Sequence, residues 1–166
     1  MDRELNDELK RLEITALNEK AENAVAVAVA ATAATGAIPI PFADAPLLIG
    51  EQVTLMATIC GIYGMDIEKD GLKMLATAAI GIGGATFVGK TVASNLLKLL
   101  PGIGSVAGGA ISAGTAGVIT YAMGMAFIEV CKMVKLGRLN QEELITTKGV
   151  AIMKSEFKNQ LLKNKN

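Results

Sequence analysis

The stretch from residue 83 to residue 100, GGATFVGKTVASNLLKLL, contains the residue types and spacing of a phosphate-binding loop. Gly84 is followed, after four residues, by Gly89, Lys90 and Thr91, which matches the pattern GxxxxGK[ST]. In nucleotide hydrolases the glycines let backbone N–H groups converge on phosphate, while the lysine contacts phosphate oxygens and the hydroxyl binds Mg²⁺. The motif therefore raises the question of whether this chain binds ATP or GTP.

The surroundings of this motif do not fit a nucleotide hydrolase. The loop should follow a buried strand of a parallel sheet, but the preceding LKMLATAAIGIGG is dominated by Leu, Ala and Gly and predicts a helix. Such enzymes also hold Mg²⁺ with a second acid, and no aspartate follows Asp70. The 76 residues after Lys90 are too few to complete the sheet. We interpret the stretch as a glycine-rich helix in which Lys90 is a tolerated or snorkelling charge.

Other patterns that could bind a metal or perform acid–base chemistry fail on their spacing. The sequence DIEKDG at 66–71 resembles the start of a calcium loop, but its twelfth position would be Thr77, where a glutamate is needed. A helix cap and a solvated helix face explain Asp44 and Glu51, and a buried or intramembrane functional carboxylate is the alternative for Glu51. The chain has no histidine, so its two cysteines offer no metal site. We therefore assign no catalytic, cofactor-binding or metal-binding residue.

The composition favours closely packed helices in apolar surroundings. Apolar residues make up 51% of the 166-residue chain, aromatic residues only 4%, and 18 residues are glycine. Small side chains allow backbones to approach closely, and a mean hydropathy of +0.43 indicates lipid contact or deep burial. The polar N-terminus MDRELNDELKRLE lacks the features of a signal peptide, which predicts a cytosolic starting point.

Charge is distributed unevenly, although the net charge is zero. Residues 1–23 carry a net charge of −3 and residues 130–166 a net charge of +5, whereas ten charged residues are spread over 24–129. A basic tail can meet nucleic acid or an anionic membrane surface. Because no aromatic interleaving accompanies the basic residues, we expect no nucleic acid; lipid attraction and simple solubility are the alternatives.

Helical periodicity and turn residues divide the first part of the chain into helices. Leu5, Leu9, Leu12 and Ala16 recur at helical spacing and predict the amphipathic start of a helix over 3–35. A second helix is expected to end at Gly64, and Asp66 is expected to cap a third that begins near Ile67 and runs toward Leu100. The residues predicted to form turns or helix starts are Pro39, Pro41, Asp44, Pro46, Pro101 and Gly102.

The most informative stretch, from Leu99 to Ile128, has thirty residues without one charge. A helix needs about 20 apolar residues to cross a bilayer, so 74–97 and 103–128 could form a membrane hairpin. The alternative is that the same segment is the buried central helix of a compact bundle. In both cases small residues four apart predict a surface for close helix packing, namely Gly104, Gly108, Ser112, Ala116, Thr120 and Gly124.

The C-terminal region predicts a basic helix. Asn140 and Glu143 form a box-like cap, and Met153, Phe157 and Leu161 fall on one side of the helix among several lysines. This pattern suits a helix at an anionic membrane interface, and equally an amphipathic helix docked on the bundle. We predict an all-α fold, a multi-helix bundle with a glycine-rich central hairpin and amphipathic terminal helices. It forms one domain, 1–166, with a lead-in helix at 1–23, an apolar region at 24–135 and the basic helix at 139–166.

Three motifs together resemble a known family. GAIPIPFADAPLLIGEQ, GATFVGKTVASNLLKLLPGIGSVAGGAISAGTAG and YAMGMAFIE are similar to a bacterial domain-of-unknown-function family that occurs alone or as the C-terminal domain of Era-like small GTPases. The resemblance covers roughly residues 20–135 and implies a helical, membrane-associated domain. The segment ELNDELKRLEITALNEKAENAV resembles the helix that leads from the GTPase module into this domain. The guanine-reading motif of GTPases is absent, so we expect a standalone member or an excised C-terminal piece.

These observations predict a non-enzymatic, membrane-associated helical domain that acts as an accessory or effector part of an Era-like GTPase. The alternatives are a soluble helical interaction or oligomerisation module and, third, a pore or permeability element. The expected partners are membrane lipid and a GTPase domain in cis or in trans, with homo-oligomers as a further possibility, and no cofactor is expected. The expected location is the cytoplasmic membrane, on its cytoplasmic side or integral, with the cytoplasm as the alternative.

The first prediction follows from the missing acid and the missing sheet. The purified chain should bind neither ATP nor GTP in isothermal titration calorimetry, and Lys90→Ala should give the same trace as the wild type. Micromolar binding that Lys90→Ala abolishes would show that the phosphate-loop pattern is functional.

Overall fold

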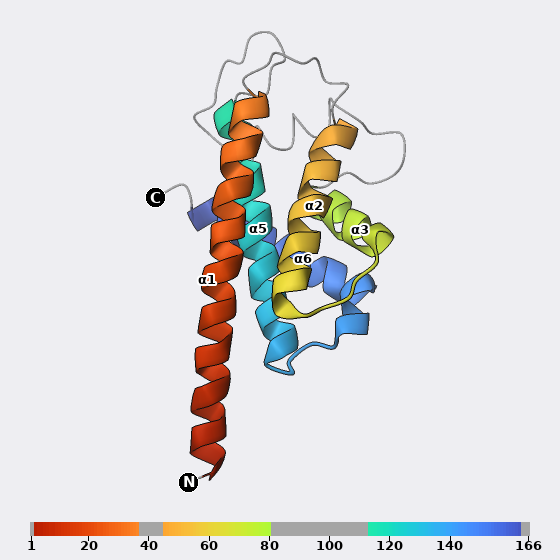
Figure 1. Cartoon of the computed structure of the whole chain (residues 1–166). Coiled ribbons are helices and arrows are strands. Elements are labelled where there is room, and N and C mark those ends of the chain that lie inside the picture. The colour runs from red at the N-terminus through yellow and green to blue at the C-terminus, as the bar shows by residue number, and fades with distance from the viewer. Residues whose placement is uncertain (1, 37–44, 81–112, 164–166) are drawn as a thin grey trace.

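The computed structural model describes residues 2–36, 45–80 and 113–163, and every regular element in these ranges is helical. Within these ranges there are five α-helices and one short 3-10 helix, which confirms the predicted all-α class. The elements are α1 (Asp2–Gly36), α2 (Ala45–Tyr63), α3 (Lys69–Ile80), α5 (Ala113–Lys135), η2 (Gln141–Ile145) and α6 (Thr147–Lys163). Figure 1 shows them as a bundle from which the N-terminal part of α1 projects.

Helix α5 lies at the centre of the bundle. It packs against α1, α2 and α6, while α3 closes the bundle by packing against α2 and α6. Most of α5 is apolar, and the sides that face the other helices are buried. Its remaining side carries Tyr121, which is 39% exposed, and the partly buried Met125, Glu129 and Lys132. Its fully buried apolar side chains are Ile119, Ala122, Met123, Ala126, Phe127, Ile128, Val130 and Cys131.

Helix α1 has two halves with different surroundings. Its bundle-facing side includes the buried residues Ile14, Ala21, Val25 and Thr32, whereas every residue from Asp2 to Glu13 is exposed. The predicted helix over 3–35 is therefore confirmed. The leucine stripe at its start lies outside the core, because the side chains that contact α5 come from the opposite side of the helix.

Glycines with positive φ end two of the helices. Gly64 has φ of 66° and Gly137 has φ of 72°, a conformation that side chains with a Cβ rarely adopt. After each glycine the next N–H reaches back to the last turn: Met65 donates to the Cys60 carbonyl at 2.8 Å, and Arg138 donates to the Met133 carbonyl at 2.9 Å. This is the Schellman arrangement, and it confirms Gly64 as the end of the second helix.

The predicted start of the third helix is wrong by two residues. We expected Asp66 to cap a helix from Ile67, but α3 begins at Lys69. The side chain of Gln141 explains the difference, because its Oε1 accepts from the Asp66 N–H at 3.3 Å and its Nε2 donates to the Asp66 carbonyl at 2.7 Å. These two bonds hold Asp66 in the link before the helix.

The C-terminal region is divided where the sequence predicted a single helix. The Glu143 carboxylate accepts from the Asn140 N–H at 2.9 Å, as the box-like cap requires, but this cap begins only the five-residue η2. Thr146 is extended (φ −103°, ψ 173°), and α6 starts after it at Thr147. Hydrogen bonds from Asn140 and Lys148 hold the pKa of Glu143 below its ordinary value. The break lets Leu144 reach the core.

A second prediction concerns the start of α6. A Cβ added to Gly149 would overlap the backbone carbonyl of Leu144, which cannot move without breaking the turn between η2 and α6. Gly149→Ala should therefore lower the free energy of unfolding by about 1–3 kcal/mol, as overpacking does.

The control is Gly61→Ala in α2, where nothing lies within 4 Å of the added carbon. That change should raise stability by about 0.5–1 kcal/mol, because alanine favours helix. Urea unfolding followed by circular dichroism measures both, and equal stability of the two variants would contradict the prediction.

Candidate functional site

Only part of the predicted packing and turn residues can be placed. Ala116 lies in α5 and Pro46 in the first turn of α2. For these two residues the structure describes the backbone and not the side chain. Thr120 and Gly124 are described and buried. The other predicted residues lie outside the described ranges, namely Pro39, Pro41, Asp44, Pro101, Gly102, Gly104, Gly108 and Ser112.

Gly124 lies where α1, α2 and α5 meet. A Cβ added to it would stand 2.5 Å from Val25 Cγ2 on α1 and 3.1 Å from Leu55 Cδ2 on α2. Only the absence of a side chain at this position allows the three helices to approach so closely. Gly117, two turns earlier on α5, is less confined, since a Cβ there would lie 3.6 Å from Val29 Cγ1, an ordinary van der Waals distance.

A buried polar pair accompanies this contact. Gln52 Nε2 on α2 donates to Thr120 Oγ1 on α5 at 3.0 Å, and both side chains are buried. Gln52 Oε1 accepts no hydrogen bond from a described residue. Thr32 on α1 is also buried, and its hydroxyl donates to the Ala28 carbonyl at 2.8 Å within its own helix. Since a buried amide without partners is costly, the Gln52–Thr120 bond sets the register of α2 against α5.

The groups with the most reactive chemistry are buried and structural. Cys60 and Cys131 are both free and buried. Burial, with a smaller contribution from Asp66, raises the pKa of Cys60 to about 11, and burial also raises that of Cys131. Burial likewise raises the pKa of Tyr63, whose hydroxyl donates to Asn18 Oδ1 and so joins α2 to α1. A thiol that stays protonated is a poor nucleophile.

Neither a metal site nor a membrane span is found in the described ranges. No three acidic or cysteine side chains among residues 2–36, 45–80 and 113–163 are placed to hold a metal ion. No helix within those ranges combines the length and the apolar character needed to cross a bilayer. Much of the predicted hairpin over 74–97 and 103–128 falls in 81–112, outside the description.

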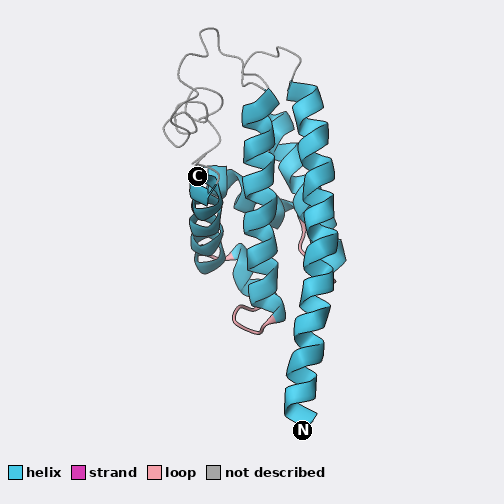
Figure 2. Ribbon diagram, turned by 90° about the vertical axis from the view of Figure 1, so that its left-hand side faces the viewer, coloured by secondary structure: helices cyan, strands magenta, loops and turns pink. Residues whose placement is uncertain are grey.

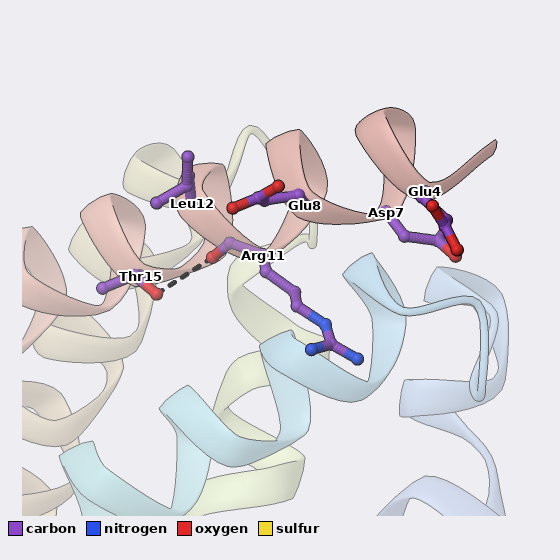
Figure 3. Close-up of a pocket in the computed structure, with 6 residues that line it drawn as sticks. All are labelled: Glu4, Asp7, Glu8, Arg11, Leu12 and Thr15. Atoms are coloured by element: carbon purple, nitrogen blue, oxygen red, sulfur yellow. Dashed lines mark hydrogen bonds between the residues drawn. The ribbon is translucent and has the colours of Figure 1, made fainter. Parts of the chain in front are cut away.

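The projecting part of α1 carries three large apolar side chains that are exposed at successive turns of the helix. Leu5, Leu9 and Leu12 are 57%, 55% and 60% exposed. A shallow groove of about 510 Å³ runs beside them, lined by Glu4, Asp7, Glu8, Arg11, Leu12 and Thr15. In Figure 3 the side chain of Leu12 points away from the bundle and that of Arg11 toward it. Lys135, which pairs with Glu13 at 3.5 Å, marks the point where α1 leaves the bundle.

Helix α6 lies on the other flank of the bundle. Its outer side is basic, whereas the N-terminal residues 1–23 are net acidic. Its apolar residues Met153, Phe157 and Leu161 are buried, so this helix docks on the bundle, as one of the two interpretations of the sequence proposed. Its outer side carries exposed lysines at 148, 154, 158 and 163. Lys148 pairs with Glu143 at 2.9 Å, whereas Lys154 and Lys158 make no ion pair with another described residue. Figure 2 shows α6 and α1 on opposite sides of the central helices.

Sequence reasoning found both of these helices but did not identify their outer faces. On α1 the signal was present, because Ile14, Ala21 and Val25 also recur at helical spacing, about 180° around the helix from the leucines. Two apolar stripes on one helix mean that one of them lies outside the core. Only the position of α5 decides which stripe is buried.

The fold defines a helical-bundle domain without a described catalytic or metal centre, and comparison with known proteins gives its family. Residues 1–151 match the family described as a domain of unknown function, DUF697. The chain belongs to this family. No solved structure matches it.

One curated relative is a magnetosome membrane protein. The chain is 30% identical over 110 residues to "Magnetosome membrane protein 22" of Magnetospirillum gryphiswaldense. The aligned region covers 66% of this chain and 56% of the relative, so the chain spans about half the length of the curated protein it matches.

A third prediction tests the contact at Gly124. Gly124→Ala should lower the free energy of unfolding by about 1–3 kcal/mol, because Val25 and Leu55 must move to admit the new carbon. Gly117→Ala on the same helix is the matched control, and it should be neutral or stabilising, because its added carbon makes an ordinary contact. Thermal melts of both variants compare them. If Gly124→Ala melts at or above the temperature of Gly117→Ala, the close approach of the three helices does not limit stability.

Proposed function

We propose that this chain is a non-enzymatic, membrane-associated helical domain. The observation that carries the proposal is the similarity to a magnetosome membrane protein. The uncharged segment of thirty residues from Leu99 to Ile128 supports it, since a run of this length without charge is compatible with lipid contact. The absence of a described metal cluster and the buried, protonated thiols support the non-enzymatic part.

The finer proposal is that the domain is an accessory or effector part of an Era-like GTPase, in cis or in trans. Its support is the resemblance of residues 4–25 to the helix that joins such a GTPase module to its C-terminal domain. In this chain those residues belong to α1, whose N-terminal part projects from the bundle (Figure 1). A projecting helix is a suitable connection, because a second domain could be attached to it without contacting the core.

An interaction or oligomerisation module is the second candidate. The specific observation in its favour is the set of half-exposed leucines on the projecting part of α1. Exposed large apolar side chains that follow one face of a helix are typical of a binding surface. The two candidates are compatible, since a membrane domain can also bind a partner.

The fourth prediction is that the full-length chain fractionates with membranes. Cells that produce the tagged chain are lysed and centrifuged, and the membrane pellet is washed with alkaline carbonate. We expect the chain in the pellet before the wash; retention after it indicates an integral protein, and release indicates a peripheral one. As a control, a fluorescent protein with the same tag should stay in the supernatant. The membrane proposal is wrong if the chain accompanies this control and also fails to float with liposomes.

A further inference from the structure

We infer that this chain associates with itself head to tail, the leucine face of α1 in one copy docking on the lysine face of α6 in the next. The leucine face consists of Leu5, Leu9, Leu12 and Ala16, and the lysine face consists of Ala151, Lys154, Ser155, Lys158 and Leu162. This association goes beyond membrane attachment and does not depend on it.

The leucine face of α1 is available to a partner. Its three leucines are 55–60% exposed, and Ala16 is exposed as well. They lie about 180° around the helix from Ile14, which contacts the bundle. The surface therefore points away from the molecule that carries it. Burying half-exposed leucines is favourable, at about 25 cal/mol per Å² of apolar surface.

The lysine face of α6 has the shape that such a helix needs. Ala151 and Ser155 are small and exposed, so another helix can approach the backbone of α6 there. Leu162 is 44% exposed and offers an apolar contact at the end of the face. Met153, Phe157 and Leu161 anchor α6 to the core from the opposite side, which keeps the face in place.

The two faces match in spacing. Leu5, Leu9, Leu12 and Ala16 follow one another at intervals of four, three and four residues. The same intervals separate four residues on α6: Ala151, Ser155, Lys158 and Leu162. Intervals that alternate between three and four form the seam through which two α-helices pack side by side. In a parallel pairing, Leu5 and Leu9 on α1 would oppose the small Ala151 and Ser155 on α6, and the small Ala16 would oppose Leu162.

The two faces also match in charge. Three acids, Asp2, Glu8 and Glu19, and one base, Lys20, lie within about 60° of the leucine face, as counted from Leu5, so its border is net acidic. Lys154 and Lys158 belong to the lysine face, and neither forms an ion pair with another described residue. Residues 1–23 carry a net charge of −3 and residues 130–166 a net charge of +5. The N-terminal region of one copy is therefore attracted to the C-terminal region of another, whereas two N-terminal or two C-terminal regions repel each other.

The two faces can pair only between copies, because the leucine face and the lysine face of one molecule lie on opposite flanks. Helices α1 and α6 both pack against α5, and Figure 2 shows them on opposite sides of it. Two complementary faces on opposite flanks of one chain produce a heterologous contact, which repeats from copy to copy and gives either a ring or an open chain of copies. An anionic membrane is a weaker fit for the lysine face. A helix lying in the membrane interface needs an apolar side, and the apolar side of α6 is buried in the core.

Two double variants remove one face each. Leu5→Gln/Leu9→Gln alters the leucine face, and Lys154→Gln/Lys158→Gln alters the lysine face; all four side chains are exposed, so the fold should be retained. Met74→Gln/Leu136→Gln and Lys69→Gln/Lys73→Gln are the matched controls, since these residues are exposed on other surfaces. Circular dichroism and thermal melts verify the fold of every variant before association is measured.

Sedimentation velocity of the purified full-length chain measures the association. The average mass of the wild type and of both controls should rise with concentration. The lysine variant should associate about tenfold more weakly, as expected from the loss of two exposed ion pairs. The leucine variant should associate roughly fiftyfold more weakly, because it loses two apolar contacts. An equimolar mixture of the two variants should form a complex of two chains and no larger species, because each variant retains the face that the other lacks.

Three results would overturn this inference. The first is a wild type that stays monomeric at all concentrations, including one that binds anionic vesicles through Lys154 and Lys158 instead. The second is association of both variants with wild-type affinity. The third is a mixture of the two variants in which no two-chain complex forms. Vesicle binding by a monomeric wild type would overturn self-association and support membrane attachment, and the other results do not bear on whether the chain fractionates with membranes, so the two proposals fail independently.

Discussion

The close contact of α5 with α1 and α2 at Gly124 is the constraint on which the described fold depends. Helix α5 is largely apolar, and burial of its apolar sides requires α1, α2 and α6 to pack around it. Val25 and Leu55 come so near to Gly124 that a single added carbon would meet both. The Gln52–Thr120 hydrogen bond lies one turn of α5 away from Gly124 and fixes the register of α2 along α5. Once these contacts are made, α3 and α6 can cover the remaining sides.

The same contact explains why the molecule has two distinct flanks. Helix α1 is longer than the core it covers, so its N-terminal part continues past the bundle with a leucine stripe that α5 cannot reach. Helix α6 uses Met153, Phe157 and Leu161 to cover α5 from the other side and leaves its lysines outward. One flank is therefore apolar and acidic, and the other is basic. The separation of charge that is visible along the sequence becomes a separation in space.

The described links, between α2 and α3 and between α5 and α6, are held by a few polar groups rather than by a large core. Gly64 and Gly137 reverse the chain after α2 and α5, because each adopts a positive φ. The Gln141 side chain bonds both backbone groups of Asp66, and the Glu143 carboxylate caps the turn that carries Leu144 into the core. These local contacts are worth about 1 kcal/mol each. Together they place α3 and α6 without requiring long apolar surfaces at the links.

The sequence by itself determined the helical class, the extent of α1, the glycine that ends α2 and the apolar side of α6. Each of these depends on interactions between residues a few positions apart, such as helical periodicity, caps and positive φ. The family was also recognisable from three motifs within residues 20–135. The tertiary structure alone decided which stripe of α1 is buried, why α3 starts at Lys69, and that the Asn140 cap begins a short turn rather than a long helix. Gln141 reaches Asp66 across 75 residues of sequence, and Gly124 of α5 lies 99 residues from Val25, the residue of α1 that it contacts. Periodicity carries no information about which of two apolar stripes another helix will meet, because that depends on contacts between segments far apart in the chain.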